Sequence, residues 1–480
     1  MASPVAPYPS TKAQAGARSA RRPATGPATI VLLLGMFATY ALASGENSVN
    51  AIFSTAAVGL LASLAFSFLI DCKGKLVRLI RVDLFMLLAL YGLTFFEFLF
   101  EQPPNKYLTV ASAQTALLAA FAGFAGIAVG RHLVPIRRGL PNPRDLGFSP
   151  KLIFQLLLLC TSLGYFYMLL SVGFNPIEMV EQMLRPRFTQ PWTRGRLGGP
   201  SALLAELSLL KAAIPALCGL ILAQRDRFRN GELVAALLIG GFVLFDGYSS
   251  GTRNVFLLYS TTFVAAYFLY AKRMGTLKLL LLGGGCAITA FGAMVTMLET
   301  RTSTGATFID LSTGEAVFVD MNLINIASLT EVFSSRQPYL GLEIPYTMII
   351  RPIPRALWPG KPEGLTVGIE EALGVGDYMT LSATFIGEFW MAGGLLAVCL
   401  GSLFLGGVAG AWNRFGARAD TQLKMLIYIT GLLPAGLCMR SFLSVAPTLL
   451  PIFALLLFVR FTARRRRAAA SRKWPEIERQ

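Results

Sequence analysis

Runs of about 20 apolar residues recur along the whole chain, and they restrict its possible folds more than any other feature. As a helix, each run is long enough to cross the roughly 30 Å hydrocarbon core of a bilayer. The composition agrees, because 54% of the 480 residues are hydrophobic and only 14% are charged. A soluble protein of this size needs a more polar exterior. The sequence therefore predicts an all-α polytopic membrane protein.

The apolar pattern predicts about 12 transmembrane helices within a membrane domain that covers residues 28–461. A large external loop, residues 298–381, separates the ninth span from the tenth. Pro434, Pro447 and Pro451 are expected to kink or interrupt the last two spans. The predicted spans are 28–44, 50–70, 82–100, 108–129, 152–172, 202–223, 233–249, 255–271, 277–297, 382–410, 425–440 and 443–461.

Most basic residues of the loops fall in alternate connections, and this bias predicts the orientation of the chain. The short connections between them carry few, since 45–49 has no basic residue and 101–107 has only Lys106. By the positive-inside rule, the basic connections are cytoplasmic, together with a disordered basic tail at 1–27 and a basic tail at 462–480. The basic residues that define these connections are Lys73, Lys75, Arg78, Arg81, Arg131, Arg137, Arg138, Arg144, Arg225, Arg227, Arg229, Lys272, Arg273, Arg414 and Arg418.

The net charge of +17 also raises nucleic acid as a partner. We set it aside because the basic residues lie mostly in short loops and tails, which is the pattern of anchoring beside anionic lipid. The six cysteines include no CxxC pair, and the one histidine, His132, lies in a basic loop. The sequence therefore predicts no metal site, no disulfide and no cofactor.

Two long segments fall on the predicted external side. The first, residues 173–201, opens with Asn175 and Pro176 and continues as IEMVEQML, which predicts a short amphipathic helix at the interface. The second, residues 298–381, is too long for a plain connector and is therefore expected to be functional. Within it, the pattern predicts a helix over 318–337 and an irregular, proline-rich stretch over 351–364.

Arginines on the predicted external side are the strongest candidates for chemistry, because they go against the charge bias. A guanidinium group forks two donors onto phosphate oxygens and keeps its charge, so a cluster of them suits a pyrophosphate. The alternative for each is snorkelling at the interface with salt bridges to nearby acids. An unpaired charge in hydrocarbon costs at least ~3 kcal/mol. We therefore assign to catalysis the arginines that lie tightly against apolar runs, which are Arg253, Arg351, Arg355 and Arg440.

Two short motifs carry several of these cations. SGTRN (250–254) is a tight turn between two spans, in which Arg253 either binds a ligand or forms an ion pair with Asp246. In RPIPRALWPGKP (351–362) the prolines restrict the backbone and present the basic side chains rigidly. There, Lys361 is a substrate-binding candidate, and Trp358 either stacks on a sugar or lies at the headgroup level.

Acidic residues and two further arginines complete the candidates. Glu388, at the start of the tenth span, is partly desolvated and serves either as a base or as a counter-ion to an arginine. Asp320 is a second candidate for proton transfer or substrate binding. Glu206 and Lys211 pair with each other or across to another helix. The first loop supplies two residues assigned to positioning sugar or phosphate, which are Arg187 and Arg194.

With these residues assembled, the chain resembles the Wzy-type polymerases of O-antigen and exopolysaccharide repeat units. The resemblance lies in SGTRN, in IPRALWPGKP and in LSATFIGEFWMAGG, in an order and topology that agree with the family over roughly 240–410. Family members often carry an arginine followed eleven positions later by glycine in two external loops. Arg187 and Gly198 satisfy this in the first loop, whereas no arginine in 298–381 does so in the second, where the basic motif 351–361 is the candidate replacement.

The resemblance implies a metal-independent, GT-C-like glycosyltransferase of the bacterial inner membrane. Such enzymes transfer the chain growing on undecaprenyl pyrophosphate to an incoming lipid-linked oligosaccharide on the outer face of the membrane. Their implied partners are the lipid-linked oligosaccharide, membrane lipid, a chain-length regulator and a flippase.

Three alternatives remain open at this point. A flippase or transporter of lipid-linked sugar also fits about 12 spans, although it predicts more charges deep in the spans and inverted repeats. An O-antigen ligase usually depends on a histidine in the large outer loop, and this chain has none there. A non-catalytic scaffold of an export complex predicts that changes at the arginines have little effect.

Overall fold

A computed structural model gives the structure of the protein. Its described residues are 25–73, 76–100, 102, 105, 108–135, 139–143, 146–147, 149–185, 189–192, 200–271, 281, 283–285, 288, 292, 321–333, 335–353, 357–362, 364–374 and 381–473. Over these residues every regular element is a helix, and the only β-type pairings are two isolated bridges. The all-helical class predicted from the sequence is confirmed.

Within the described part of the chain, 8 helices are long and apolar enough to cross a membrane. Two further apolar helical segments, Val82–Thr94 and Val445–Phe461, are shorter. These helices fall where the hydropathy pattern places spans, which supports a membrane-embedded protein. The predicted span 277–297 lies almost wholly outside the described residues. The total of about 12 spans and the GT-C-like arrangement therefore remain predictions.

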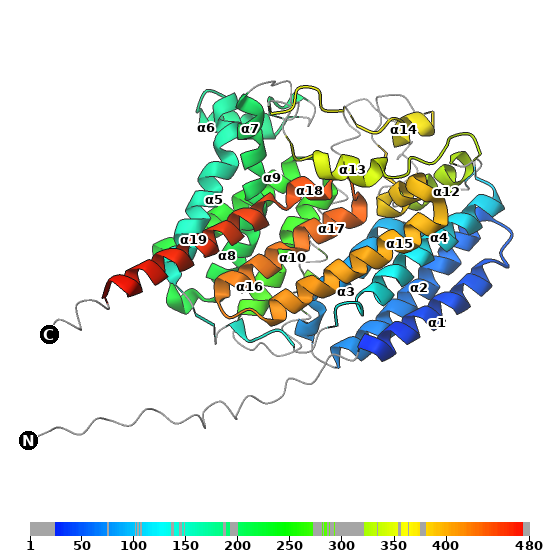
Figure 1. The fold of residues 1–480 in the computed structure, drawn as a ribbon, viewed down its shortest axis with the longest axis horizontal. Coiled ribbons are helices and arrows are strands. Elements are labelled where there is room, and N and C mark those ends of the chain that lie inside the picture. The colour runs from blue at the N-terminus through cyan, green and yellow to red at the C-terminus, as the bar shows by residue number, and fades with distance from the viewer. Residues whose placement is uncertain are drawn as a thin grey trace, which may run out of the picture.

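The spans form a slanted bundle in which the chain returns repeatedly between two ends (Figure 1). Several of its helices carry their own boundary signals; the side chain of Ser48, for example, accepts from the N–H of Ala51 at the start of one span. The main helices of the bundle are α1 (Thr25–Ala43), α2 (Val49–Cys72), α3 (Val82–Thr94), α4 (Val110–Gly130), α5 (Pro150–Ser171), α9 (Asn230–Ser249), α10 (Arg253–Tyr270), α15 (Thr384–Ala417), α16 (Gln422–Thr430), α17 (Leu432–Arg440), α18 (Val445–Thr448) and α19 (Leu450–Lys473).

Small residues allow the central helices α4 and α15 to approach closely. A Cβ on Gly130 would lie 2.2 Å from the carbonyl oxygen of Leu403, and one on Gly406 would lie 2.4 Å from that of Ile127. In lipid, where the hydrophobic effect does not drive helices together, such close backbone packing is a main source of association. The glycines therefore fix α15 against α4 and determine where its two ends emerge.

Two spans are interrupted within their length. The span over Leu204–Ala223 consists of α7 (Pro200–Leu207), a 3-10 turn η6 (Ser208–Ala213) and α8 (Ile214–Ala223), with Pro215 just after the turn. The 34-residue α15 breaks at Gly393 and Gly394, the latter with φ 62° and ψ −151°. Mid-helix 3-10 segments and broken spans often mark binding sites in membrane proteins.

Short helices outside the spans gather at one end of the bundle, which we call the loop end (Figure 1). They are α6 (Pro176–Met183), α12 (Asn322–Val332), α13 (Glu343–Ile350) and α14 (Ile369–Ala372). The predicted helix in the first long loop is confirmed as α6, whose N-cap Asn175 accepts from the N–H groups of Ile177 and Glu178. The helix predicted over 318–337 is confirmed as the shorter α12. The described residues of 351–364 form turns, as predicted.

Candidate active site

The break in α15 positions the first functional residue at the loop end. Because Gly393 and Gly394 leave the helical conformation, the carbonyl groups before them lose their ordinary helical partners. The N–H of Leu340 donates to the carbonyl of Met391 at 2.8 Å, and the N–H of Gly341 donates to that of Ala392 at 2.9 Å. The outer loop thus caps the break, and a separate half-helix over residues 384–392 carries Glu388.

Glu388 binds the turn that follows α17. Its Oε1 accepts from the hydroxyl of Ser441 at 2.6 Å, and its Oε2 accepts from the N–H groups of Phe442 at 2.6 Å and Leu443 at 3.2 Å. The residue is 3% exposed. The three donors satisfy both oxygens of the buried carboxylate and hold it in one orientation. In this structure Glu388, the predicted functional carboxylate, holds the turn that follows Arg440.

Further contacts join the neighbouring segments to this turn. The hydroxyl of Ser382 donates to the carbonyl of Arg440 at 3.3 Å, and the side-chain amide of Asn325 donates to the carbonyl of Ser382 at 2.7 Å. Arg351 directly follows α13, which packs against α15. Glu388, the backbone of Arg440 and the loop that contains Arg351 therefore all lie at the loop end.

Lys361 stabilises the loop that contains Arg351. Its Nζ donates to the carbonyl groups of Arg351 and Ile353, both at 2.9 Å. It also interacts electrostatically with Glu206 of α7. The Lys361 ammonium therefore organises its own loop, while the half-buried Trp358 follows the same turn. These observations do not test the substrate-binding roles predicted for Lys361 and Trp358.

Arg253 begins α10 directly after the tight turn that joins it to α9. The first long loop reaches this turn, because the side-chain amide of Gln190 donates to the carbonyl of Ser249 at 3.5 Å, as well as to those of Met183 and Arg185. Asp246, the predicted ion-pair partner of Arg253, accepts hydrogen bonds from Lys211 and Tyr165. The turn with Arg253 therefore lies under the first loop at the same end of the bundle.

Lys211 is a charged residue inside a span, and it finds its partner across the bundle. Its Nζ lies 2.8 Å from Oδ2 of Asp246 on α9 and 5.1 Å from the ring centroid of Tyr165 on α5. This confirms pairing across to another helix, which was one of the two expectations for Lys211. Ionisable groups within spans usually pair and mark functional regions.

A cavity of about 160 Å³ lies beside Lys211. Val255 and Leu258 line it within the first two turns of α10 after Arg253, and Leu433 and Leu437 line it from α17, within two turns of Arg440. A cavity of about this volume, when lined by apolar side chains, accommodates a molecule the size of benzene. The two arginines therefore begin and end the helices that enclose an apolar cavity, and Lys211 adds one cation to its wall.

Four predicted site residues lie outside the described residues, namely Arg187, Arg194, Asp320 and Arg355. They stay predictions.

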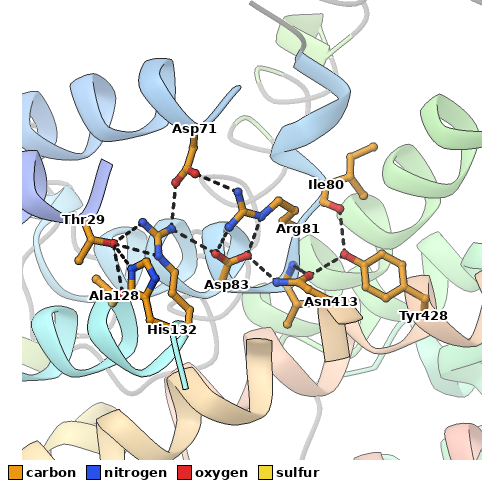
Figure 2. A network of polar contacts seen from close by, with 11 residues as sticks. Thr29, Asp71, Ile80, Arg81, Asp83, Ala128, His132, Asn413 and Tyr428 are labelled. Carbon is orange, nitrogen blue, oxygen red and sulfur yellow. Dashed lines mark hydrogen bonds and ion pairs between the residues drawn. The ribbon is translucent and has the colours of Figure 1, made fainter. Parts of the chain in front are cut away.

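The opposite end of the bundle contains a charge network that the sequence pattern did not reveal (Figure 2). Arg131 contacts Asp71 at 2.9 Å and Asp83 at 3.2 Å, and Arg81 contacts Asp71 at 3.0 Å and also pairs with Asp83. Both carboxylates are fully buried. The charge bias places Arg81 and Arg131 in basic cytoplasmic connections. The structure shows that both side chains are buried together with two neutralising acids.

Neutral polar groups extend this network to the second half of the chain (Figure 2). The Asn413 amide donates to Asp83 at 2.6 Å, and its oxygen accepts from the Tyr428 hydroxyl at 2.8 Å. On the other side, Arg131 donates to Thr29 at 2.7 Å, and the Thr29 hydroxyl lies 2.8 Å from Nε2 of His132. Burial and the adjacent guanidinium lower the pKa of His132. The network therefore joins α1, α2, α3, α4, α15 and α16. We interpret it as a set of contacts that stabilises the packing of these helices.

Fold and site together describe a polytopic helical membrane protein in which an apolar cavity lies between α10, which begins at Arg253, and α17, which ends at Arg440. Comparison of the chain with protein-family models, curated proteins and solved structures finds no match. The assignment of function therefore depends on the site itself and on the sequence motifs.

Proposed function

We propose that this protein is a metal-independent, inverting, GT-C-like glycosyltransferase that polymerises lipid-linked oligosaccharide repeat units into O-antigen or exopolysaccharide. It acts at the outer face of the bacterial inner membrane, with both termini cytoplasmic. The observation that carries the proposal is the apolar cavity between helices that begin at Arg253 and end at Arg440, two arginines at the end of the bundle that also carries Arg351 and Glu388. Cations above an apolar cavity suit a substrate that joins a diphosphate to a hydrocarbon chain.

In the proposed reaction, a hydroxyl of the incoming sugar attacks the anomeric carbon of the growing chain. The bond from that carbon to the diphosphate oxygen breaks, and the anomeric centre passes through a state with oxocarbenium character. Negative charge increases on the departing diphosphate. Arg253, Arg351 and Arg440 would stabilise that charge most strongly in the transition state, which lowers the barrier.

Glu388 has a positioning role in this proposal. Its three hydrogen bonds hold the turn after Arg440. The hydroxyl of the acceptor must still lose its proton. Because diphosphate is a good leaving group, a weak base is sufficient, and Asp320 of the second outer loop remains the candidate.

The test is a deletion strain examined by a glycan ladder on a gel, complemented by Arg→Lys variants. We expect deletion to give glycan capped with single repeat units at the outer face. Arg351→Lys and Arg440→Lys should shorten or abolish the ladder, because Lys cannot fork two donors onto a diphosphate. Arg336→Lys is the matched control, since Arg336 is an exposed arginine of the same outer loop.

The same experiment distinguishes the alternative functions. Repeat units that accumulate on the cytoplasmic side would indicate a flippase. Polymer that forms normally but remains on the lipid carrier would indicate a ligase. An unchanged ladder from normally expressed Arg351→Lys and Arg440→Lys proteins would remove these arginines from the reaction.

A further inference from the structure

The exposed face of α13 is apolar along its whole length. Tyr346 and Ile349 lie three residues apart in the helix, and Leu342, its N-cap residue, lies four residues before Tyr346, which places the three on one side. Leu342 is 82% exposed and Ile349 is 64% exposed. The opposite face is also apolar, since Ile344 and Ile350 are buried. A helix that is apolar on both faces is suited either to a protein core or to a lipid environment.

Charged groups of α13 are directed away from this exposed face. The Glu343 carboxylate accepts a hydrogen bond from the N–H of Thr366 in the neighbouring loop. Arg351 follows the last residue of the helix and interacts with Glu388. The exposed stripe therefore contains no charge, while a cation lies at its end, beside the candidate active site.

A second exposed apolar stripe lies on the helix α15. Leu396, Leu400, Phe404 and Val408 are exposed at four-residue spacing along the part of α15 that follows its break. This stripe ends at the break where Leu340 and Gly341 donate to the carbonyl groups of Met391 and Ala392. Tyr339 packs at the same point, because a Cβ on Gly394 would lie 2.7 Å from its hydroxyl oxygen.

The beginning of α13 is therefore fixed at the level where the exposed apolar surface of α15 ends. α6 at the same end shows a similar arrangement, with Phe174, Ile177 and Leu184 exposed just beyond α5. Exposed apolar surface that continues from a spanning helix onto an adjoining helix indicates one continuous lipid contact.

We propose that α13 lies in the plane of the membrane surface, with Leu342, Tyr346 and Ile349 inserted among the phospholipid chains of the leaflet at the loop end. Bilayer phospholipid is the occupant, because the stripe continues the lipid-facing surface of α15 and carries no charge. The candidate site beside Arg351 then lies at headgroup depth and opens sideways to that leaflet. This membrane contact of α13 does not depend on which reaction takes place at the site.

The test uses benzoylphenylalanine, a photoreactive amino acid, incorporated singly in the full-length protein in native membranes. Leu342 and Ile349 are the test positions. Leu400, exposed on α15, is the lipid-facing control, and Glu371, exposed on α14, is the polar control. After illumination and purification, mass spectrometry should show a gain of one phospholipid mass at the test positions and at Leu400, and no such gain at Glu371.

Two results would overturn the proposal. Crosslinks from Leu342 and Ile349 to protein, whether a second copy of this chain or another protein, would make the stripe a protein interface. Absence of any adduct at both positions, as at Glu371, would place α13 in water. Each variant is also scored for polymer ladder, so that loss of the lipid adduct in a protein that still polymerises refutes this inference alone.

Discussion

Replacement of Arg131 by methionine tests whether the buried charge network stabilises the bundle. The side chain is 2% exposed and donates to Asp71 at 2.9 Å and to Asp83 at 3.2 Å. Methionine fills much of the volume but supplies no donor. Both fully buried carboxylates would then share Arg81, which leaves one buried negative charge without compensation.

The expected loss of unfolding free energy is about 3–5 kcal/mol, the usual cost when one partner is removed from a buried ion pair. Lys424→Met is the matched control at the same end of the bundle, because Lys424 pairs with Asp420 at 2.7 Å in an exposed i, i+4 pair. An exposed pair of this kind contributes about 0.3–0.5 kcal/mol. The difference between the two variants isolates the effect of burial.

The assay is denaturant titration of the purified protein in mixed micelles, followed by tryptophan fluorescence. A double variant, Arg131→Met with Asp71→Asn, restores charge balance and should be less destabilised than the sum of the two single variants. If Arg131→Met were no less stable than Lys424→Met, the network would not stabilise the packing of the helices. Strict additivity in the double variant would show that Arg131 and Asp71 are energetically independent.

Three further outcomes are expected. Because the pKa of His132 is lowered from 6.5, the unfolded chain binds more protons than the folded one below that pH; thermal stability should therefore fall as the pH decreases through 6.5, and His132→Gln should flatten this dependence. Gly394→Ala should cost about 1–3 kcal/mol in thermal unfolding, because φ is 62° and the new Cβ would contact Tyr339; a neutral effect would show that α15 tolerates an ordinary residue at the break. Leu437→Trp should fill the apolar cavity and shorten the glycan ladder at normal expression, whereas an unchanged ladder would remove the cavity from the proposed reaction.

Local signals in the sequence predict most of the helices. The apolar run 108–129 corresponds to Val110–Gly130, and the Asn175–Pro176 pair begins α6. Such signals depend on residues that are adjacent or one turn apart, so they can be read without the fold. The predicted Glu388 also lies beside Arg440 and Arg351, because all three belong to segments that hydropathy and charge bias place at one end.

The partners of charged residues could not be predicted in the same way. Asp71 and Arg131 are 60 residues apart, and their pairing depends on how α2 and α4 are rotated about their axes. For the same reason, the choice of Asp246 as the partner of Lys211 required the fold.

The sequence by itself determined that this is a helical membrane protein and where most of its apolar helices lie. The tertiary structure decided that Glu388 holds a turn, that the outer loop caps the break in α15, and that Arg81 and Arg131 are buried against Asp71 and Asp83. Hydropathy reports how far a segment prefers lipid to water, which is a property of composition. A hydrogen bond or ion pair requires two groups within about 3 Å, which only the packing of distant helices determines.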